Sequence, residues 1–148
     1  MRFPRILLVS ASIALACAAY LVFAPNTGWS TDYEAARVSA AKSGKKLMLD
    51  FTGSDWCIYC KKLDKEVFST PEFREFAKDY VLVCLDYPKG KELPEAERKQ
   101  NDALQAQFKI EEFPTVIIAD PSGTEVRRAS GYEPDSGPQA YLAQFAQH

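Results

Sequence analysis

Two cysteines, Cys57 and Cys60, stand three positions apart behind a tryptophan in the stretch WCIYC. Such a pair suits a redox centre, half of a metal site, a structural disulfide or a haem attachment site. A zinc site takes four Cys or His ligands, and beyond residue 24 the chain adds only Cys84 and His148. A disulfide closing so small a loop would constrain the unfolded chain little, and haem attachment needs His where Lys61 stands. Redox chemistry is therefore favoured, and we expect neither a metal nor a cofactor.

The position of the pair gives its two thiols different roles. A helical pattern runs from Cys57 towards Phe68, which places Cys57 near unpaired backbone N–H groups at the start of a helix. Such a setting lowers a thiol pKa from about 8.5 into a range of roughly 3.5 to 7.5. Cys60 lies one turn further on the same face, within reach of a mixed disulfide on Cys57. We expect Cys57 to be the exposed nucleophile and Cys60 the shielded resolving thiol.

The elements that must position this pair alternate regularly along the chain. Thr31 and Glu34 form a capping box before the first helix, and Ser43-Gly44 ends it. Turn residues and apolar periodicity predict helices over residues 31–43, 57–68, 71–77, 94–108 and 138–146, and strands over residues 47–52, 80–85, 115–119 and 124–129. This order predicts an α/β fold with a mixed central sheet sandwiched between helices.

The first 24 residues read as a targeting segment. Arg2 and Arg5 precede an apolar run of about 18 residues, close to the roughly 20 that span a bilayer, with Ala16-Cys17-Ala18 as a cleavage site. Residues 1–24 are thus a signal peptide or an N-terminal membrane anchor, residues 25–30 a linker, and residues 31–148 the folded domain. Either form of the leader delivers the domain to the periplasm or otherwise outside the cytoplasmic membrane.

Composition bounds the remaining possibilities. With 148 residues, 47% of them hydrophobic and 26% charged, the chain fits one globular domain with its own core. A net charge of −2 gives no reason to expect a nucleic-acid partner. The short chain shows no dimerisation segment, so we expect a monomer.

Three motifs together resemble the thioredoxin superfamily: a strand ending in LDF, WCIYC at a helix start, and FPT leading into a later strand. The stretch DFTGSDWCIYCKKLDKEVFSTPEF is similar to the periplasmic thioredoxin-like proteins related to the carboxy-terminal domain of DsbD. The resemblance covers residues 29–148. It implies a thioredoxin fold and a thiol–disulfide oxidoreductase acting on protein disulfides.

The resemblance assigns roles to four residues around the pair. Cys57 and Cys60 match the nucleophile and the resolving thiol of a redox-active disulfide, and Trp56 matches the aromatic residue that flanks and shields it. Asp50 matches a buried acid that moves the proton of the resolving thiol, and burial would raise its pKa. An Asp at a strand end also occurs simply as a solvated or turn-capping group.

Further positions would form the substrate-binding surface. Pro114 matches a cis proline beside the disulfide, where the backbone of Phe113 stays free to pair with an extended substrate and Thr115 opens the strand. Outside this resemblance, a proline opening a strand is an edge or turn proline. Common thioredoxins carry Gly-Pro between the cysteines, whereas Ile58 and Tyr59 would either enlarge an apolar contact surface or block one.

The direction of electron flow and the role of Cys84 stay open at this level. Cys84 is a buried inert thiol or, if exposed, a redox or regulatory one. Strong oxidants of the superfamily have His between the cysteines, so Ile58-Tyr59 favours a reductase or electron relay. An exported reductant then implies a transmembrane electron donor. The alternatives are a disulfide isomerase or oxidase, and a binding module that presents Trp56 and its neighbours without catalysis.

Overall fold

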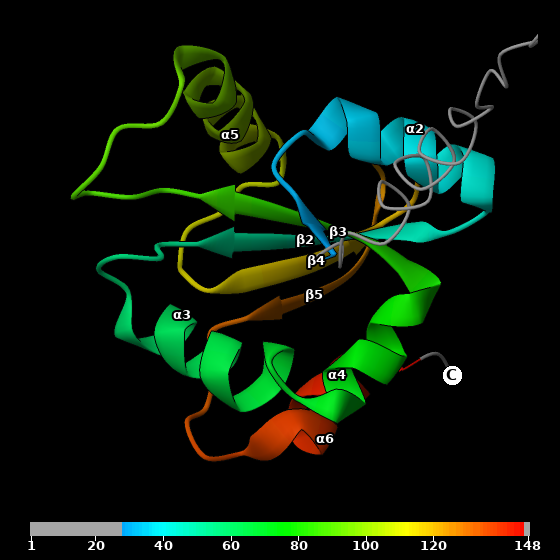
Figure 1. Cartoon of the computed structure of the whole chain (residues 1–148), viewed down its shortest axis with the longest axis vertical. Helices are drawn as coiled ribbons and strands as arrows, with labels where there is room; N and C mark the ends of the chain where they lie inside the picture. Colours follow the sequence, from blue (N-terminus) through cyan, green and yellow to red (C-terminus); the bar gives the residue numbers. More distant parts are fainter. Residues whose placement is uncertain (1–27, 147–148) are drawn as a thin grey trace, which may run out of the picture.

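Five strands form one mixed sheet in the order β1-β3-β2-β4-β5. The computed structural model describes residues 28–146 (Figure 1). The strands are β1 (Trp29–Ser30), β2 (Lys46–Thr52), β3 (Tyr80–Asp86), β4 (Thr115–Ala119) and β5 (Glu125–Ser130). β1, β3 and β2 run parallel, whereas β4 is antiparallel to both β2 and β5. The expected mixed sheet is confirmed.

Helices cover both faces of this sheet (Figure 1). α2 (Tyr33–Ser43) and α5 (Glu95–Gln107) pack on one face, and α3 (Ile58–Leu63), α4 (Pro71–Phe76) and α6 (Gly137–Leu142) on the other. A π-helix (Asp64–Phe68) continues α3, and short 3-10 turns (Ala77–Asp79, Ala143–Phe145) follow α4 and α6. The helix predicted from Cys57 to Phe68 is therefore confirmed, although its last five residues take the wider π form. The wider π turn still buries Val67 and Phe68.

Two residues of the predicted linker belong to the sheet. The leader expected over residues 1–24 and the first half of the linker expected over residues 25–30 lie outside the described residues. Trp29 and Ser30, however, form β1, and the Trp29 ring packs 5.2 Å from Phe68 and 5.9 Å from Phe73 between centroids. A two-residue edge strand carries no periodicity, so the sequence pattern did not indicate it. Between residues 28 and 146, no helix is both long and apolar enough to cross a membrane.

The first helix is capped by a different residue from the one predicted. The Asp32 carboxylate accepts the N–H of Ala35 at 2.9 Å and so caps α2. The capping box of Thr31 and Glu34 is wrong because the helix begins one residue later than that pattern requires. Glu34 instead pairs with Arg37, one turn along the helix, at 3.0 Å.

Alternation along β2 decides which side chains reach the reactive face of the sheet. Leu47, Leu49 and Phe51 point into the core under α2 and α5. Met48 points to the opposite face, where α3 and α6 pack, and Asp50 follows it two residues later. The strand therefore carries one carboxyl group into the layer that holds the cysteine pair.

Candidate active site

The cysteine pair closes a disulfide at the start of α3. Cys57 and Cys60 are bonded, with their Cα atoms 5.3 Å apart. Cys57 has an extended backbone and caps the helix, and its Sγ accepts the N–H of Cys60 at 3.2 Å. Its own N–H donates to the Gly53 carbonyl at 2.8 Å, which closes the turn before the helix. A backbone N–H directed at this sulfur favours a thiolate there in the reduced form.

Exposure does not distinguish the two cysteines, contrary to the sequence-based expectation. Both are only 5% exposed in the disulfide form. In the disulfide form, the Cys57 sulfur lies 3.7 Å from the carbonyl oxygen of Phe113. Cys60 instead lines a cavity of about 310 Å³ together with Asp50 and Cys84. The cysteines therefore differ in their neighbours: the first faces the Phe113 carbonyl, and the second shares a cavity with Asp50.

Asp50 has the burial expected of it. The residue is 7% exposed, and its Oδ1 atom has no hydrogen-bond partner within the described part of the chain. Burial raises the pKa of this carboxyl to about 8, and the charges of Asp64 and Asp86 add to the rise. At neutral pH the group is mostly protonated while the cysteines form a disulfide. A carboxyl group with this pKa can both donate and accept a proton near pH 7.

Cys84 lies beside Asp50 on the neighbouring strand and is half-buried. Burial, together with the charges of Asp50 and Asp86, raises the pKa of its thiol to about 12. The thiol therefore stays protonated at neutral pH, which agrees with the interpretation of Cys84 as an inert group.

Three apolar side chains project from the turn and the first turn of α3. Trp56 is 40% exposed, Ile58 63% and Tyr59 50%. Only one other large hydrophobic side chain within residues 28–146, Val38 on α2, is exposed. We call Trp56, Ile58 and Tyr59 the apolar rim. Ile58 and Tyr59 point outward, so they enlarge the apolar surface around the disulfide instead of covering it.

The segment before β4 completes the site. The peptide bond between Phe113 and Pro114 is cis, as expected. The Phe113 ring packs edge-on against Trp56, with centroids 5.8 Å apart. Thr115 is 1% exposed and its hydroxyl donates to the Glu112 carbonyl at 2.8 Å. Its side chain is thus turned inward, and its backbone pairs with β2 and β5.

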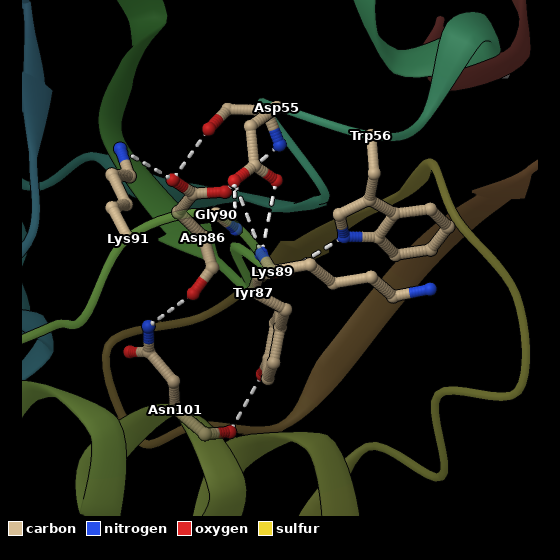
Figure 2. A network of polar contacts seen from close by, with 9 residues as sticks. Asp55, Trp56, Asp86, Tyr87, Lys89, Gly90, Lys91 and Asn101 are labelled. Atoms are coloured by element: carbon tan, nitrogen blue, oxygen red, sulfur yellow. Dashed lines mark hydrogen bonds and ion pairs between the residues drawn. The ribbon is translucent and has the colours of Figure 1, made fainter.

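The sequence-based analysis missed one part of the site, the loop of residues 86–91. Figure 2 shows this loop bonded to the turn before Cys57, with Asp55 and Trp56 contacting backbone groups of Tyr87, Lys89 and Gly90. Backbone donors and acceptors leave no signature in side-chain patterns, so the sequence did not indicate these contacts. Within the described residues, no group of three or more His, Cys, Asp or Glu side chains is placed to hold a metal ion.

The structure combines a mixed sheet covered by helices with a C-x-x-C disulfide at a helix start and a cis proline beside it. This combination defines a thioredoxin-fold thiol–disulfide oxidoreductase. The family model described as a thioredoxin-like domain matches residues 33–146, and the chain belongs to this family.

Individual relatives agree with this class. The disulfide bond reductase DsbH of Chlamydia pneumoniae is 34% identical over 123 residues, which cover 82% of this chain and 72% of that protein. The thiol:disulfide interchange protein DsbD of Pectobacterium atrosepticum is 30% identical over 108 residues, 72% of this chain but only 17% of DsbD.

Solved structures give the same result. A DsbH oxidoreductase matches with a TM-score of 0.74 and 29% identity, covering 97% of this chain and 92% of that one. The reduced carboxy-terminal domain of DsbD from Neisseria meningitidis, with a TM-score of 0.55 and 21% identity over 74% of this chain and 88% of that one, shares the fold.

Proposed function

We propose that this protein reduces disulfide bonds of protein substrates outside the cytoplasmic membrane. The observation that carries the proposal is the disulfide of Cys57 and Cys60 at the start of α3, surrounded by the exposed apolar rim. A histidine between the cysteines would stabilise the thiolate and favour oxidation, and Ile58 and Tyr59 bring no such charge. The similarity to a protein named disulfide bond reductase supports the same direction.

Reduction would proceed through a mixed disulfide. The Cys57 thiolate attacks one sulfur of the substrate disulfide, and the other substrate sulfur leaves as a thiolate that takes a proton from water. The Cys60 thiolate then attacks the Cys57 sulfur and releases the second substrate thiolate. Two electrons pass to the substrate, and the Cys57–Cys60 disulfide of this structure remains.

Asp50 would serve the second step. Cys60 lines the same cavity as Asp50, and its thiol must lose a proton before it attacks. An ionised Asp50 can accept that proton, and its raised pKa makes it a stronger base than an ordinary carboxylate. Only the ionised fraction can act, so this step should become faster as the pH rises towards 8.

The substrate would lie across the apolar rim and the Phe113-Pro114-Thr115 backbone. The Phe113 carbonyl is next to the Cys57 sulfur, so a substrate strand that pairs with this backbone would present its own disulfide to Cys57. The rim offers apolar contact area to residues that flank the substrate cysteine. All of these groups come from one chain, so we propose that a monomer is active.

The leader supports a location outside the cytoplasmic membrane, and that location determines where the electrons must come from. Arg2 and Arg5 before an apolar run support export, as a signal peptide or an N-terminal anchor. A reductase on that side must regain two electrons after each turnover, so we propose a transmembrane protein as its electron donor.

The reduction potential of the Cys57–Cys60 pair tests the direction. The purified protein is equilibrated against dithiothreitol or glutathione buffers, and free thiols are alkylated and counted by mass spectrometry. We expect a potential near the thioredoxin end of the range, about −270 mV. A value near that of strong oxidants, about −120 mV, would reverse the proposed direction. If no reversible pair formed, the protein would not be a redox catalyst.

A further inference from the structure

Consecutive residues of the turn before Cys57 are bonded to the loop of residues 86–91, which we call the clamp loop. Ser54 makes the first contact, donating its N–H and its hydroxyl to the Asp86 carboxylate at 2.9 and 2.7 Å. Lys91 pairs with the same carboxylate at 3.1 Å. The first residue of the clamp loop is thus held from both sides.

Asp55 makes the second contact, and it binds backbone alone. Its carboxylate accepts the N–H of Lys89 at 3.0 Å and that of Gly90 at 2.6 Å, and these bonds lower its pKa (Figure 2). A Cβ on Gly90 would lie 3.0 Å from Asp55 Oδ2, so the close approach suits glycine. Lys61 donates to the Asp55 carbonyl at 2.9 Å. The Asp55 carboxylate thus joins the turn before Cys57 to the clamp loop.

Trp56 makes the third contact, and its indole is held on several sides. Nε1 donates to the Tyr87 carbonyl at 2.8 Å, and the Lys89 ammonium lies 3.9 Å from the ring centroid (Figure 2). A Cβ on Gly53 would come within 2.5 Å of the indole, so the ring lies directly on the Gly53 backbone. Although it is 40% exposed, the ring therefore has a fixed position beside the disulfide.

The clamp loop separates the turn from α5 and forms part of a pocket of about 810 Å³. Trp56, Tyr87 and Phe113 line the end nearest the disulfide. On the far side the loop is tied to α5, since the Tyr87 hydroxyl donates to the Asn101 carbonyl at 2.6 Å and the Asn101 amide donates to the Asp86 carbonyl at 3.0 Å. The pocket is thus preformed, and it is continuous with the surface assigned to the substrate because Trp56 and Phe113 belong to both.

We propose that Asp55 is a positioning residue that holds the clamp loop and the Trp56 indole in place, so that this pocket is ready for the polypeptide segment flanking the substrate cysteine. The inference rests on the proposed function. A loop that is already ordered need not be ordered when the substrate binds, which improves affinity without any new contact. Asp55 touches neither cysteine, so its loss should weaken binding of a protein substrate more than it slows the chemical steps.

The test compares Asp55→Ala with Asp55→Asn, which keeps an acceptor oxygen, and with Asp120→Ala as the matched control. Asp120 is also a carboxylate that accepts backbone N–H groups, from Ser122 and Thr124, but it lies in the β4–β5 turn at the opposite end of the sheet. Each variant is assayed for kcat and KM with insulin as the protein disulfide, and with hydroxyethyl disulfide as a small one.

Asp55→Ala should raise the KM for insulin by about three- to tenfold and leave kcat within about twofold. The reason is that the clamp loop and the Trp56 indole must then be ordered when the substrate binds. Asp55→Asn should recover part of this loss, and Asp120→Ala should behave as wild type. With Trp29, the chain's other tryptophan, replaced by Phe, Asp55→Ala should also make Trp56 fluorescence more accessible to acrylamide quenching. A purely supporting role in folding would not change this quenching in the folded protein.

Two results would overturn the inference alone: an unchanged insulin KM in Asp55→Ala while wild type is active, or unchanged quenching of Trp56. If Asp55→Ala does not fold, Gly90→Ala disturbs the same bond from the other side and must give the same pattern. A wild-type protein that reduces hydroxyethyl disulfide but not insulin would overturn the proposed function, and this inference with it.

Discussion

Replacing Asp50 with Asn should make the protein more stable, and increasingly so as the pH rises. The pKa of Asp50 is raised from 3.8 to about 8, chiefly by burial. Between these two pH values the folded protein keeps a proton on Asp50 that the unfolded chain has lost. A carboxyl group with a raised pKa therefore lowers the free energy of unfolding as the pH increases towards 8. An Asn side chain is neutral throughout and removes this dependence.

The expected magnitude follows from the span between the two pKa values. Within that span, each pH unit changes the free energy of unfolding by about 1.4 kcal/mol. From pH 5 to pH 7, wild type should lose about 3 kcal/mol relative to Asp50→Asn. Any constant difference from exchanging a hydroxyl for an amide shifts both ends equally and leaves the slope unchanged.

Urea unfolding of the oxidised protein at pH 5, 6, 7 and 8 measures this slope. Asp120→Asn is the control, because the pKa of that carboxyl is lowered by hydrogen bonds from Ser122 and Thr124 and its contribution is constant above pH 5. Stability curves of wild type and Asp50→Asn that stay parallel from pH 5 to pH 8 would refute the assignment of a protonated, buried Asp50.

Three further predictions concern the remaining groups of the site. Cys60→Ser should accumulate a mixed disulfide between Cys57 and a protein substrate, detectable as a covalent adduct by mass spectrometry, whereas Cys57→Ser should give none; adducts on Cys57→Ser would reverse the two roles. The Cys84 thiol, with a pKa of about 12 instead of 9.0, should react with iodoacetamide at pH 7 about a thousandfold more slowly in the folded protein than in urea, and equal rates would contradict its burial. Gly53→Ala should lower the free energy of unfolding by about 1–3 kcal/mol, because the new methyl group meets the Trp56 indole, and urea midpoints equal to those of wild type would show that the indole can move aside.

Local signals in the sequence predicted most of the secondary structure. The stop at Gly44, where φ is +69°, and Pro71 in the first turn of α4 lie where the pattern placed them. Apolar runs located β2, β3 and β4 to within about a residue at each end. These signals succeeded because caps, turns and periodicity depend on residues close together in the chain.

The sequence-based predictions that failed concerned contacts between residues far apart in the chain. Trp29 and Ser30 form a strand only because β3 offers an edge to pair with, and no pattern in so few residues could predict it. The equal burial of Cys57 and Cys60 likewise depends on the Phe113 carbonyl beside Cys57 and on the residues that share a cavity with Cys60, such as Asp50 and Cys84, which come from other parts of the chain.

The sequence by itself determined the chemistry of this protein: two cysteines at a helix start, with an acid seven residues before the first of them. Only the tertiary structure decided how that chemistry is presented. The register of β2 with β3 sets Asp50 beside Cys84, and the bonds of Asp55 and Trp56 attach the clamp loop to the active-site turn. The partners in those bonds are backbone groups of Tyr87, Lys89 and Gly90. Every residue carries a backbone carbonyl and every residue except proline an N–H, so which of these groups meet is decided by the fold and not by side-chain patterns.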